Sequence, residues 1–262
     1  MSLFWHPYQK LWNRSLVRRL RGRGMAGQAV ITVLIWVDSL ILLARAAARR
    51  VRSRGARDQV VYVDCGLHKH GEQLRWVRRW FGDDALLIGI EASPSHFADA
   101  SANLSDLNAT LIHAAVVGPQ HTGDTVRLYR ASDYGKDDSL FVQRGSEFED
   151  VTARRLSSLL QEQGLADRSL IVRMNIEGAE RFVVEDLLDA RIPVRGWFGM
   201  WDDLGEIDAG ADLEFRGLLR KHGISPFTFN DRDLPKDGGR LAGAFALRRL
   251  AIRIALDAAA RR

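Results

Sequence analysis

Two acidic residues lie where apolar, strand-length segments of the sequence end. Asp64 and Gly66 follow the segment 60–63, and Glu91 follows the segment 85–90. A glycine at such a point lets the backbone approach a ligand closely, and an acid after the next strand can accept hydrogen bonds from both hydroxyls of a ribose. Glu91 lies 27 positions after Asp64, close to the ~20-residue spacing of a nucleoside-binding crossover. The pattern indicates either such a site or a plain strand–helix–strand crossover with a turn glycine.

The residues around this glycine restrict the kind of ligand. The loop has the form D-x-G-x-x-x-x-G from Asp64 to Gly71, which is neither the dinucleotide pattern G-x-G-x-x-G nor a phosphate-binding P-loop. An acid just before the glycine would repel a pyrophosphate, whereas it suits a ligand that carries positive charge. S-adenosylmethionine, with its sulfonium and ammonium groups, is such a ligand.

A further acid, Glu177, follows the buried-type segment 169–176. Ligands of α/β sheets bind at the carboxyl ends of inner strands, so Glu177 is a candidate base for removing the proton of an acceptor hydroxyl. Alternatively, it caps the next helix, where an acid contributes about 0.3–1 kcal/mol. His68 and His70 in the glycine loop are candidates for a base or a substrate contact. With Cys65 they lack the spacing and the fourth ligand of a zinc site, so no metal is expected.

Strand-length apolar segments alternate with helical patterns from about residue 60 to residue 229. This alternation is typical of a doubly wound α/β sheet. Strands are expected at 60–63, 85–90, 110–118, 125–129, 169–176, 194–201 and 225–229, and helices at 72–81, 97–104, 153–163, 181–190 and 211–222. Residues 133–150 are polar and are expected to form a surface loop.

Both ends of the chain are basic and are expected to be helical. The apolar segment 29–48 contains Asp38 near its centre and is followed by a basic linker, 45–57, while 241–262 has the pattern of a basic amphipathic helix. Asp38 would cost about 2.5–3.5 kcal/mol inside a bilayer, and the uninterrupted apolar runs are shorter than the ~20 residues of a span. A buried or interfacial helix is therefore favoured over a membrane span. The expected division is 1–57, 58–240 and 241–262.

Composition limits the environment and the partners of the chain. Its 262 residues can bury one sizeable core, and the single cysteine, Cys65, suits a reducing compartment. The net charge of +5 is concentrated toward the two ends, which indicates an anionic surface, membrane or nucleic acid, or else a solvated basic face. The chain is thus expected in the cytoplasm, with the inner face of the membrane as a peripheral site.

The chain resembles the FkbM-type S-adenosylmethionine-dependent methyltransferases in four segments that occur in the same order. The resembling segments are Val63-Asp64-Cys65-Gly66, Ile90-Glu91-Ala92-Ser93-Pro94, Ala114-Ala115-Val116-Val117-Gly118 and Arg173-Met174-Asn175-Ile176-Glu177-Gly178-Ala179-Glu180. This resemblance implies a Rossmann-like, mostly parallel sheet of the class I methyltransferase type with a reversed last strand. It also implies O-methyl transfer to a sugar or another small polyhydroxyl compound.

The resemblance also implies roles for individual residues. Asn175 and Glu177 would face the reaction centre, although the family has an aspartate at the position of Asn175 and a lysine at that of Arg173. The family's first motif continues Ala-Asn-x-Gly, whereas the segment 67–71 reads Leu-His-Lys-His-Gly. The cofactor would be bordered by Asp64 and Gly66 at its methionine part, by Glu91 at the ribose hydroxyls, and by Ala92, Ser93, His113 and Ala114 at adenine.

Two other classes of function stay open at this stage. The altered first loop and Asn175 are also what a non-catalytic descendant, kept as a binding or scaffold protein, would carry. The terminal arginines suggest a nucleic-acid methyltransferase, but they lie outside the core and no base-stacking motif accompanies them. We therefore expect a small-molecule acceptor, a homo-oligomer if the N-terminal helix packs against a partner subunit, and no nucleic-acid partner.

Overall fold

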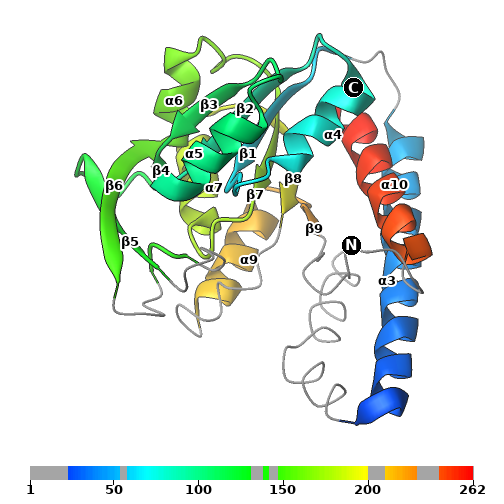
Figure 1. The fold of residues 1–262 in the computed structure, drawn as a ribbon. Helices are drawn as coiled ribbons and strands as arrows, with labels where there is room; N and C mark the ends of the chain where they lie inside the picture. Colours follow the sequence, from blue (N-terminus) through cyan, green and yellow to red (C-terminus); the bar gives the residue numbers. More distant parts are fainter. Residues whose placement is uncertain are drawn as a thin grey trace. The chain divides into compact units, whose positions relative to one another are not determined.

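The computed structural model describes residues 23–53, 58–130, 138–141, 147–199, 210–228 and 242–261. The chain divides into two compact units. One unit comprises residues 1–55 and 230–261, and the other comprises residues 56–229 (Figure 1). Each unit is described below by itself. Asp202 and Asp203, which follow the predicted strand 194–201, lie outside the described residues.

A six-stranded sheet with the order β3-β2-β1-β7-β8-β9 forms the centre of the larger unit. Every pairing between these strands is parallel. The strands are β1 (Val61–Cys65), β2 (Leu86–Glu91), β3 (Thr110–His113), β7 (Leu170–Met174), β8 (Val194–Gly199) and β9 (Phe227–Thr228). The fold is therefore mixed α/β with a mostly parallel central sheet, which is compatible with a Rossmann-like fold.

Burial explains why these segments form strands. All residues of β1 and β7 are buried, as expected for inner parallel strands with both faces covered. Helices α4 (Glu72–Phe81) and α5 (Pro94–Asn103) pack against the β1–β3 side of the sheet (Figure 1). The other helices of this unit are α6 (Leu156–Glu162), α7 (Glu180–Asp189) and α9 (Ala211–Lys221).

The strand order contains a topological switch point. From β1 the chain moves outward to β2 and β3, and it then returns to the other side of β1 to form β7, β8 and β9. The reversed last strand implied by the resemblance is wrong for the part of the sheet that the structure describes, because β9 pairs in parallel with β8. The switch point places the carboxyl ends of β1 and β7 side by side, and ligands of open α/β sheets bind at such a point.

A second, three-stranded sheet corrects three predictions. It consists of β4 (Ala115–Val117), β5 (Thr125–Tyr129) and β6 (Phe148–Arg155), in the order β4-β6-β5. The predicted strand 110–118 is divided: Ala114 still donates its N–H to the carbonyl of Glu91 in the central sheet (3.0 Å), whereas β4, which begins at Ala115, pairs with β6. The predicted loop 133–150 and helix 153–163 both overlap β6, whose inward residues pack with Ala115 and Leu128 around Val151.

Two helices form the described part of the smaller unit. They are α3 (Gly24–Arg52) and α10 (Ala242–Ala259). They run in parallel: Trp36 lies against Gly243, and farther along both helices Arg50 pairs with Asp257 (2.7 Å). The expected linker 45–57 is wrong in its first part, since α3 continues to Arg52. By length and composition alone, α3 would suffice to cross a membrane, a property that it shares with core helices of soluble proteins.

The polar residue at the centre of α3 has a partner. Arg248 of α10 forms an ion pair with Asp38 and donates a hydrogen bond to the hydroxyl of Ser39 (3.0 Å). All three residues are buried. Burial raises the pKa of Asp38 to about 6, against the opposing effect of the nearby guanidinium of Arg248. Asp38 can therefore be buried, as predicted, because Arg248 from the other end of the chain balances its charge.

Candidate functional site

The switch point brings together two of the predicted segments. Cys65 at the end of β1 is in register with Met174 at the end of β7, and the N–H of Asn175 donates to the carbonyl of Cys65 (3.0 Å). Gly66 and Asn175 are thus direct neighbours across the two strand ends. The parallel arrangement explains this meeting, because the carboxyl ends of adjacent parallel strands lie at the same edge of the sheet.

Gly66 is required by its contact with the neighbouring strand. Its φ is +84°, and an added Cβ would lie 2.2 Å from the carbonyl oxygen of Asn175. The sequence suggested that this glycine lets the backbone approach a ligand. In the structure, it lets the backbone after β1 approach the backbone after β7. The glycine therefore fixes the distance between the two halves of the candidate site.

Asp64 is paired inside the protein. The guanidinium of Arg173 lies 2.6 Å from Asp64 Oδ1 and also donates to the carbonyl of Gly66 (3.2 Å). Burial raises the pKa of the Asp64 carboxyl, and the positive charge of Arg173 opposes this effect. The second oxygen, Oδ2, is buried and has no hydrogen-bond partner among the described residues. The charge of Asp64 is thus balanced by the protein, with one acceptor atom left over.

Glu91 connects the ends of β1 and β2. Its Oε2 accepts the N–H of His68 (2.7 Å), and its Oε1 accepts the N–H of Ser93 (2.9 Å). The residue is 8% exposed. Burial raises its pKa, and the two backbone N–H groups, together with the nearby His96, act in the opposite direction. Each carboxylate oxygen has a second lone pair, so Glu91 holds the loop and the turn while it retains acceptor capacity.

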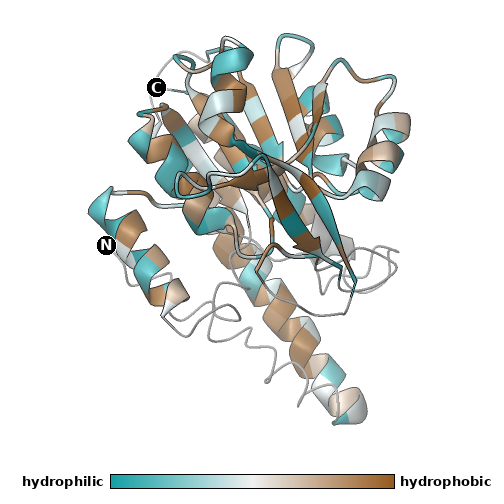
Figure 2. Ribbon diagram, turned by 90° about the vertical axis from the view of Figure 1, so that its left-hand side faces the viewer, coloured by the Kyte–Doolittle hydropathy of each residue, from teal (hydrophilic) through white to brown (hydrophobic). Residues whose placement is uncertain are grey.

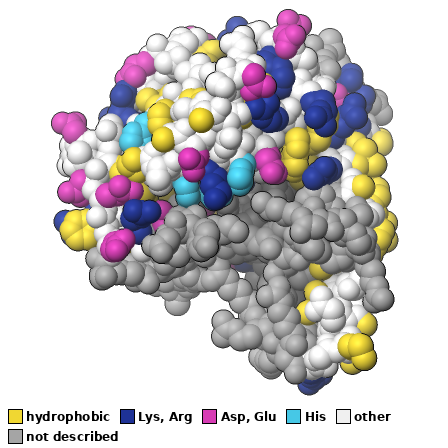
Figure 3. All heavy atoms as spheres, in the orientation of Figure 1, with side chains coloured by type: hydrophobic (Ala, Val, Ile, Leu, Met, Phe, Trp, Pro, Cys, Tyr) yellow, Lys and Arg dark blue, Asp and Glu magenta, His cyan; other side chains and the backbone are white. Residues whose placement is uncertain are grey.

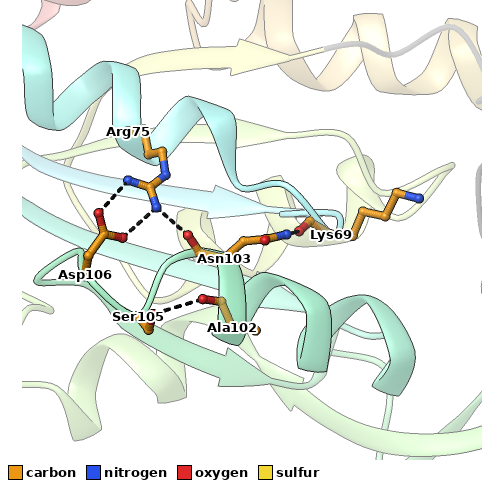
Figure 4. A network of polar contacts seen from close by, with 6 residues as sticks. All are labelled: Lys69, Arg75, Ala102, Asn103, Ser105 and Asp106. Carbon is orange, nitrogen blue, oxygen red and sulfur yellow. Dashed lines mark hydrogen bonds and ion pairs between the residues drawn. The ribbon is translucent and has the colours of Figure 1, made fainter.

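The loop 66–71 is held at several points. The N–H groups of Gly66 and Leu67 both donate to the carbonyl of Ile90 (3.0 and 3.1 Å). Asn103 at the end of α5 donates its side-chain amide to the carbonyl of Lys69 (2.7 Å), as Figure 4 shows. The loop is therefore held by main-chain bonds to β2 and by the side chains of Asn103 and Glu91.

Figure 4 also shows what fixes Asn103 itself. Arg75 of α4 forms a bidentate ion pair with Asp106, in which Nη1 lies 3.0 Å from Oδ2 and Nη2 lies 2.6 Å from Oδ1. The same guanidinium donates to the carbonyl of Asn103. In the same segment, the hydroxyl of Ser105 donates to the carbonyl of Ala102 (2.9 Å). The pairing with Arg75 lowers the pKa of the exposed Asp106 carboxyl. This network ties the end of α5 to α4, and through Asn103 it supports the loop.

The segments assigned to adenine by the resemblance also meet. Ser93 is buried, and the ring of His113, at the end of β3, approaches the carbonyl of Ala92 (Nε2 to oxygen, 3.1 Å). The imidazole of His113 is stacked on the ring of Phe97, with 4.9 Å between ring centres. Ala114 follows directly and is buried. The carboxyl ends of β2 and β3 thus present an aromatic surface next to Glu91.

The two glutamates after β7 have different surroundings. Glu180, the first residue of α7, accepts the N–H groups of Ile176 (2.9 Å) and Gly178 (2.8 Å), so its carboxylate holds the turn that precedes the helix. These two contacts are made by Glu180 and not by Glu177, which the sequence analysis considered as a cap of this helix. Glu177 is buried with φ +50°, and its carbonyl accepts the hydroxyl of Ser139 (2.8 Å). A non-glycine residue in this backbone region is strained, and such strain is frequent at functional sites.

A third histidine, which the sequence analysis did not identify, joins the loop. The ring of His96, in the first turn of α5, lies 4.5 Å from that of His68, and His70 lies 5.7 Å from His68. The sequence did contain a signal for His96. The residue follows the Ser93–Pro94 turn directly, and the first turn of the helix that begins there faces the end of the preceding strand. Among the described residues, no group of three histidine, cysteine or acidic side chains is arranged to hold a metal ion.

Placement is thus known for all residues predicted at the site. Asp64, Gly66 and Asn175 meet at the switch point, and Glu177 lies two residues after Asn175, in the turn before α7. Glu91, Ala92, Ser93, His113 and Ala114 form the neighbouring group at the ends of β2 and β3. No protein-family model, curated protein or solved structure matches the chain. Its function therefore has to be inferred from the placement of its own residues.

Proposed function

We propose that the larger unit, which contains both sheets, is an S-adenosylmethionine-dependent O-methyltransferase that acts on a sugar or another small polyhydroxyl compound. One observation carries the proposal. The ends of three adjacent parallel strands, β2, β1 and β7, bring an acid, a glycine loop and a strained glutamate to one edge of the sheet at the switch point. The sequence resemblance assigns the same residues to cofactor and acceptor.

The residues of this edge fit the proposed cofactor. Glu91 retains a lone pair on each oxygen for the two ribose hydroxyls, and the stacked His113 and Phe97 offer an aromatic surface for adenine. Asp64 Oδ2 is a buried acceptor without a partner among the described residues. Because this atom is covered by protein, the ammonium of the cofactor would reach it only if the loop shifts. The bound cofactor would supply an electrophilic methyl group.

The protein's own part in the reaction would be positioning and proton removal. Methyl transfer from a sulfonium needs an acceptor oxygen held in line and relieved of its proton. Glu177 is the base in this proposal, because it follows the end of β7 next to the switch point and is buried there at a strained φ of +50°. Asn175 would orient the acceptor through its amide, a group that cannot act as a base.

Calorimetric titration of the full chain with S-adenosylmethionine and S-adenosylhomocysteine tests the proposal. We expect the wild type to bind both ligands, and Glu91→Ala to weaken both at least tenfold. His113→Ala should weaken binding as well, and since His113 is exposed, its loss should leave the fold intact. The matched control is Asp83→Ala, an exposed acid that precedes β2 at the opposite edge of the sheet. Equal affinities of Glu91→Ala and Asp83→Ala would contradict the proposal.

A non-catalytic binding protein is the second candidate, and a specific observation favours it. Both acids already have protein partners: Asp64 is paired with Arg173, and Glu91 holds two backbone N–H groups. These contacts alone would explain why acids stand at the two positions. In that case the wild type binds neither ligand, while Glu91→Ala lowers the thermal midpoint because the loop loses its anchor.

A further inference from the structure

The helix α3 carries an apolar face that no described residue of its own unit covers. Its larger side chains are exposed at spacings of three and four residues, so they line one side of the helix. Val33, for example, is 60% exposed. Figure 3 shows hydrophobic side chains along the edge where α3 lies, and Figure 2 shows apolar residues along much of this helix. The face comprises Val30, Val33, Val37, Leu40, Ile41 and Val51, with exposed alanines at 26, 29, 44, 47 and 48.

The opposite side of the same helix is already occupied. Its buried residues include Ile35, Leu42 and Ala46, and the buried Asp38 and Ser39 contact Arg248 of α10. The uncovered apolar face is therefore not the side that packs against α10. A water-soluble helix normally places polar residues on the side away from its core, so this second apolar side indicates a further apolar partner.

Charge identifies the chemistry of that partner. Together α3 and α10 contain seven arginines and two aspartates, and both aspartates are paired with arginines. In α3 the arginines Arg45, Arg49, Arg50 and Arg52 follow the apolar stretch. An apolar face beside a cluster of arginines matches the surface of an anionic bilayer, where each basic residue near the surface contributes about 1 kcal/mol.

A second copy of the chain is a poorer match for this face. Asp38 is the only acidic residue in α3, and it is buried and paired. Two copies of the face packed in parallel would therefore bring these arginines together without an acid of α3 between them, and like charges in close contact are unfavourable. Lipid phosphates, in contrast, supply the opposite charge beside an apolar layer.

A helix that crosses the bilayer is also a poorer match. Arg248 is bound to the centre of α3, so the middle of α10 has to follow α3 wherever it lies. Arg249 and Arg253 are exposed on α10. If α3 spanned the membrane, these two side chains would enter the hydrocarbon region, at about 2.5–3.5 kcal/mol each on insertion scales. A helix in the plane of the interface leaves them in the headgroup region.

We infer that the apolar face of α3 binds the surface of an anionic lipid bilayer, with the helix lying in the interface. The apolar side chains enter the boundary between headgroups and acyl chains, and arginines exposed on the two helices, Arg52, Arg249 and Arg253, contact lipid phosphates. Binding of this kind increases with the apolar area buried and with the anionic lipid content. This inference does not depend on the proposed enzymatic activity.

Vesicle sedimentation with the full chain tests the inference. Vesicles of phosphatidylcholine are compared with vesicles that contain 30% phosphatidylglycerol, at about 0.1 M salt. We expect at least tenfold tighter binding to the anionic vesicles and a loss of most of this difference at high salt. The double substitution Val33→Glu with Val37→Glu should weaken binding at least tenfold. Leu213→Glu, which places the same charge at an exposed apolar position of α9, should not change it.

Three other outcomes would contradict the inference, and two of them would identify what covers the apolar face instead. If the chain is a dimer in solution, and Val33→Glu with Val37→Glu makes it monomeric without changing vesicle binding, the face belongs to a second copy. If membrane-bound chain withstands an alkaline carbonate wash, α3 spans the bilayer. If the wild type binds neither kind of vesicle, the apolar face does not bind lipid.

Discussion

Replacement of Arg173 by methionine should lower the free energy of unfolding by about 3–5 kcal/mol, the range for a buried charge that loses its partner. Asp64 is fully buried, and Arg173 is the residue that balances its charge. Burial already raises the pKa of Asp64. Without the guanidinium, the carboxyl group would have to be buried either as an unpaired anion or as a neutral acid. Urea denaturation followed by far-ultraviolet circular dichroism measures the loss.

Two companion variants make this prediction specific. In the Arg173→Met background, Asp64→Leu should restore most of the lost stability, because replacing both partners of a buried pair by apolar residues is often neutral. The control is Arg195→Met in β8, whose partner Asp58 is half exposed. Exposed pairs contribute about 0–1 kcal/mol. Losses of similar size for Arg173→Met and Arg195→Met would show that the buried pair has no special role.

Replacement of Gly66 by alanine should cost about 3 kcal/mol or more and abolish cofactor binding as well. The new Cβ would meet the carbonyl oxygen of Asn175 at 2.2 Å at a φ of +84°. Strained backbone of this kind costs about 1–3 kcal/mol by itself. Relief of the clash requires the ends of β1 and β7 to separate, although the N–H of Asn175 is bonded to the carbonyl of Cys65.

Gly164→Ala provides the comparison for this second prediction. Gly164 has a φ of +67°, and an added Cβ would meet nothing within 4 Å among the described residues. Its substitution should show the backbone cost alone, about 1–2 kcal/mol. The same denaturation assay measures both variants, and the difference between them isolates the contact with Asn175. If both substitutions cost the same, the close packing of the two strand ends does not matter for stability.

The central sheet was largely predictable, whereas the second sheet was not. Inner parallel strands such as β1 and β7 are continuous apolar segments, and a helix such as α4 has a clear inward side, so the bounds of α4 agree with the predicted 72–81. In β6 only Val151 and Ala153 are buried, among polar and charged neighbours. The strand is defined by its pairing with β4 and β5, and such long-range pairing leaves little local signal.

The site was predictable as a set of positions, but its contacts were not. The rule that parallel strands end at the same edge was sufficient to place Asp64, Glu91 and Asn175 together. The partner of Asp64 was not foreseen, because the pairing with Arg173 depends on strands 109 residues apart in sequence. The contacts of Glu180 depended on backbone geometry at Ile176 and Gly178, which residue types alone do not determine.

The parallel pairing of α3 with α10 has a consequence for protein synthesis. Arg52 ends α3 and Ala242 begins α10, so about 190 residues are translated between the two helices. At about 5–20 residues per second, this interval lasts roughly 10–40 s. During that time the nascent chain presents a long apolar helix, with Asp38 still lacking its arginine, while the sheet unit is being made. Ribosome-associated chaperones and nearby membranes would therefore meet α3 well before its intramolecular partner exists.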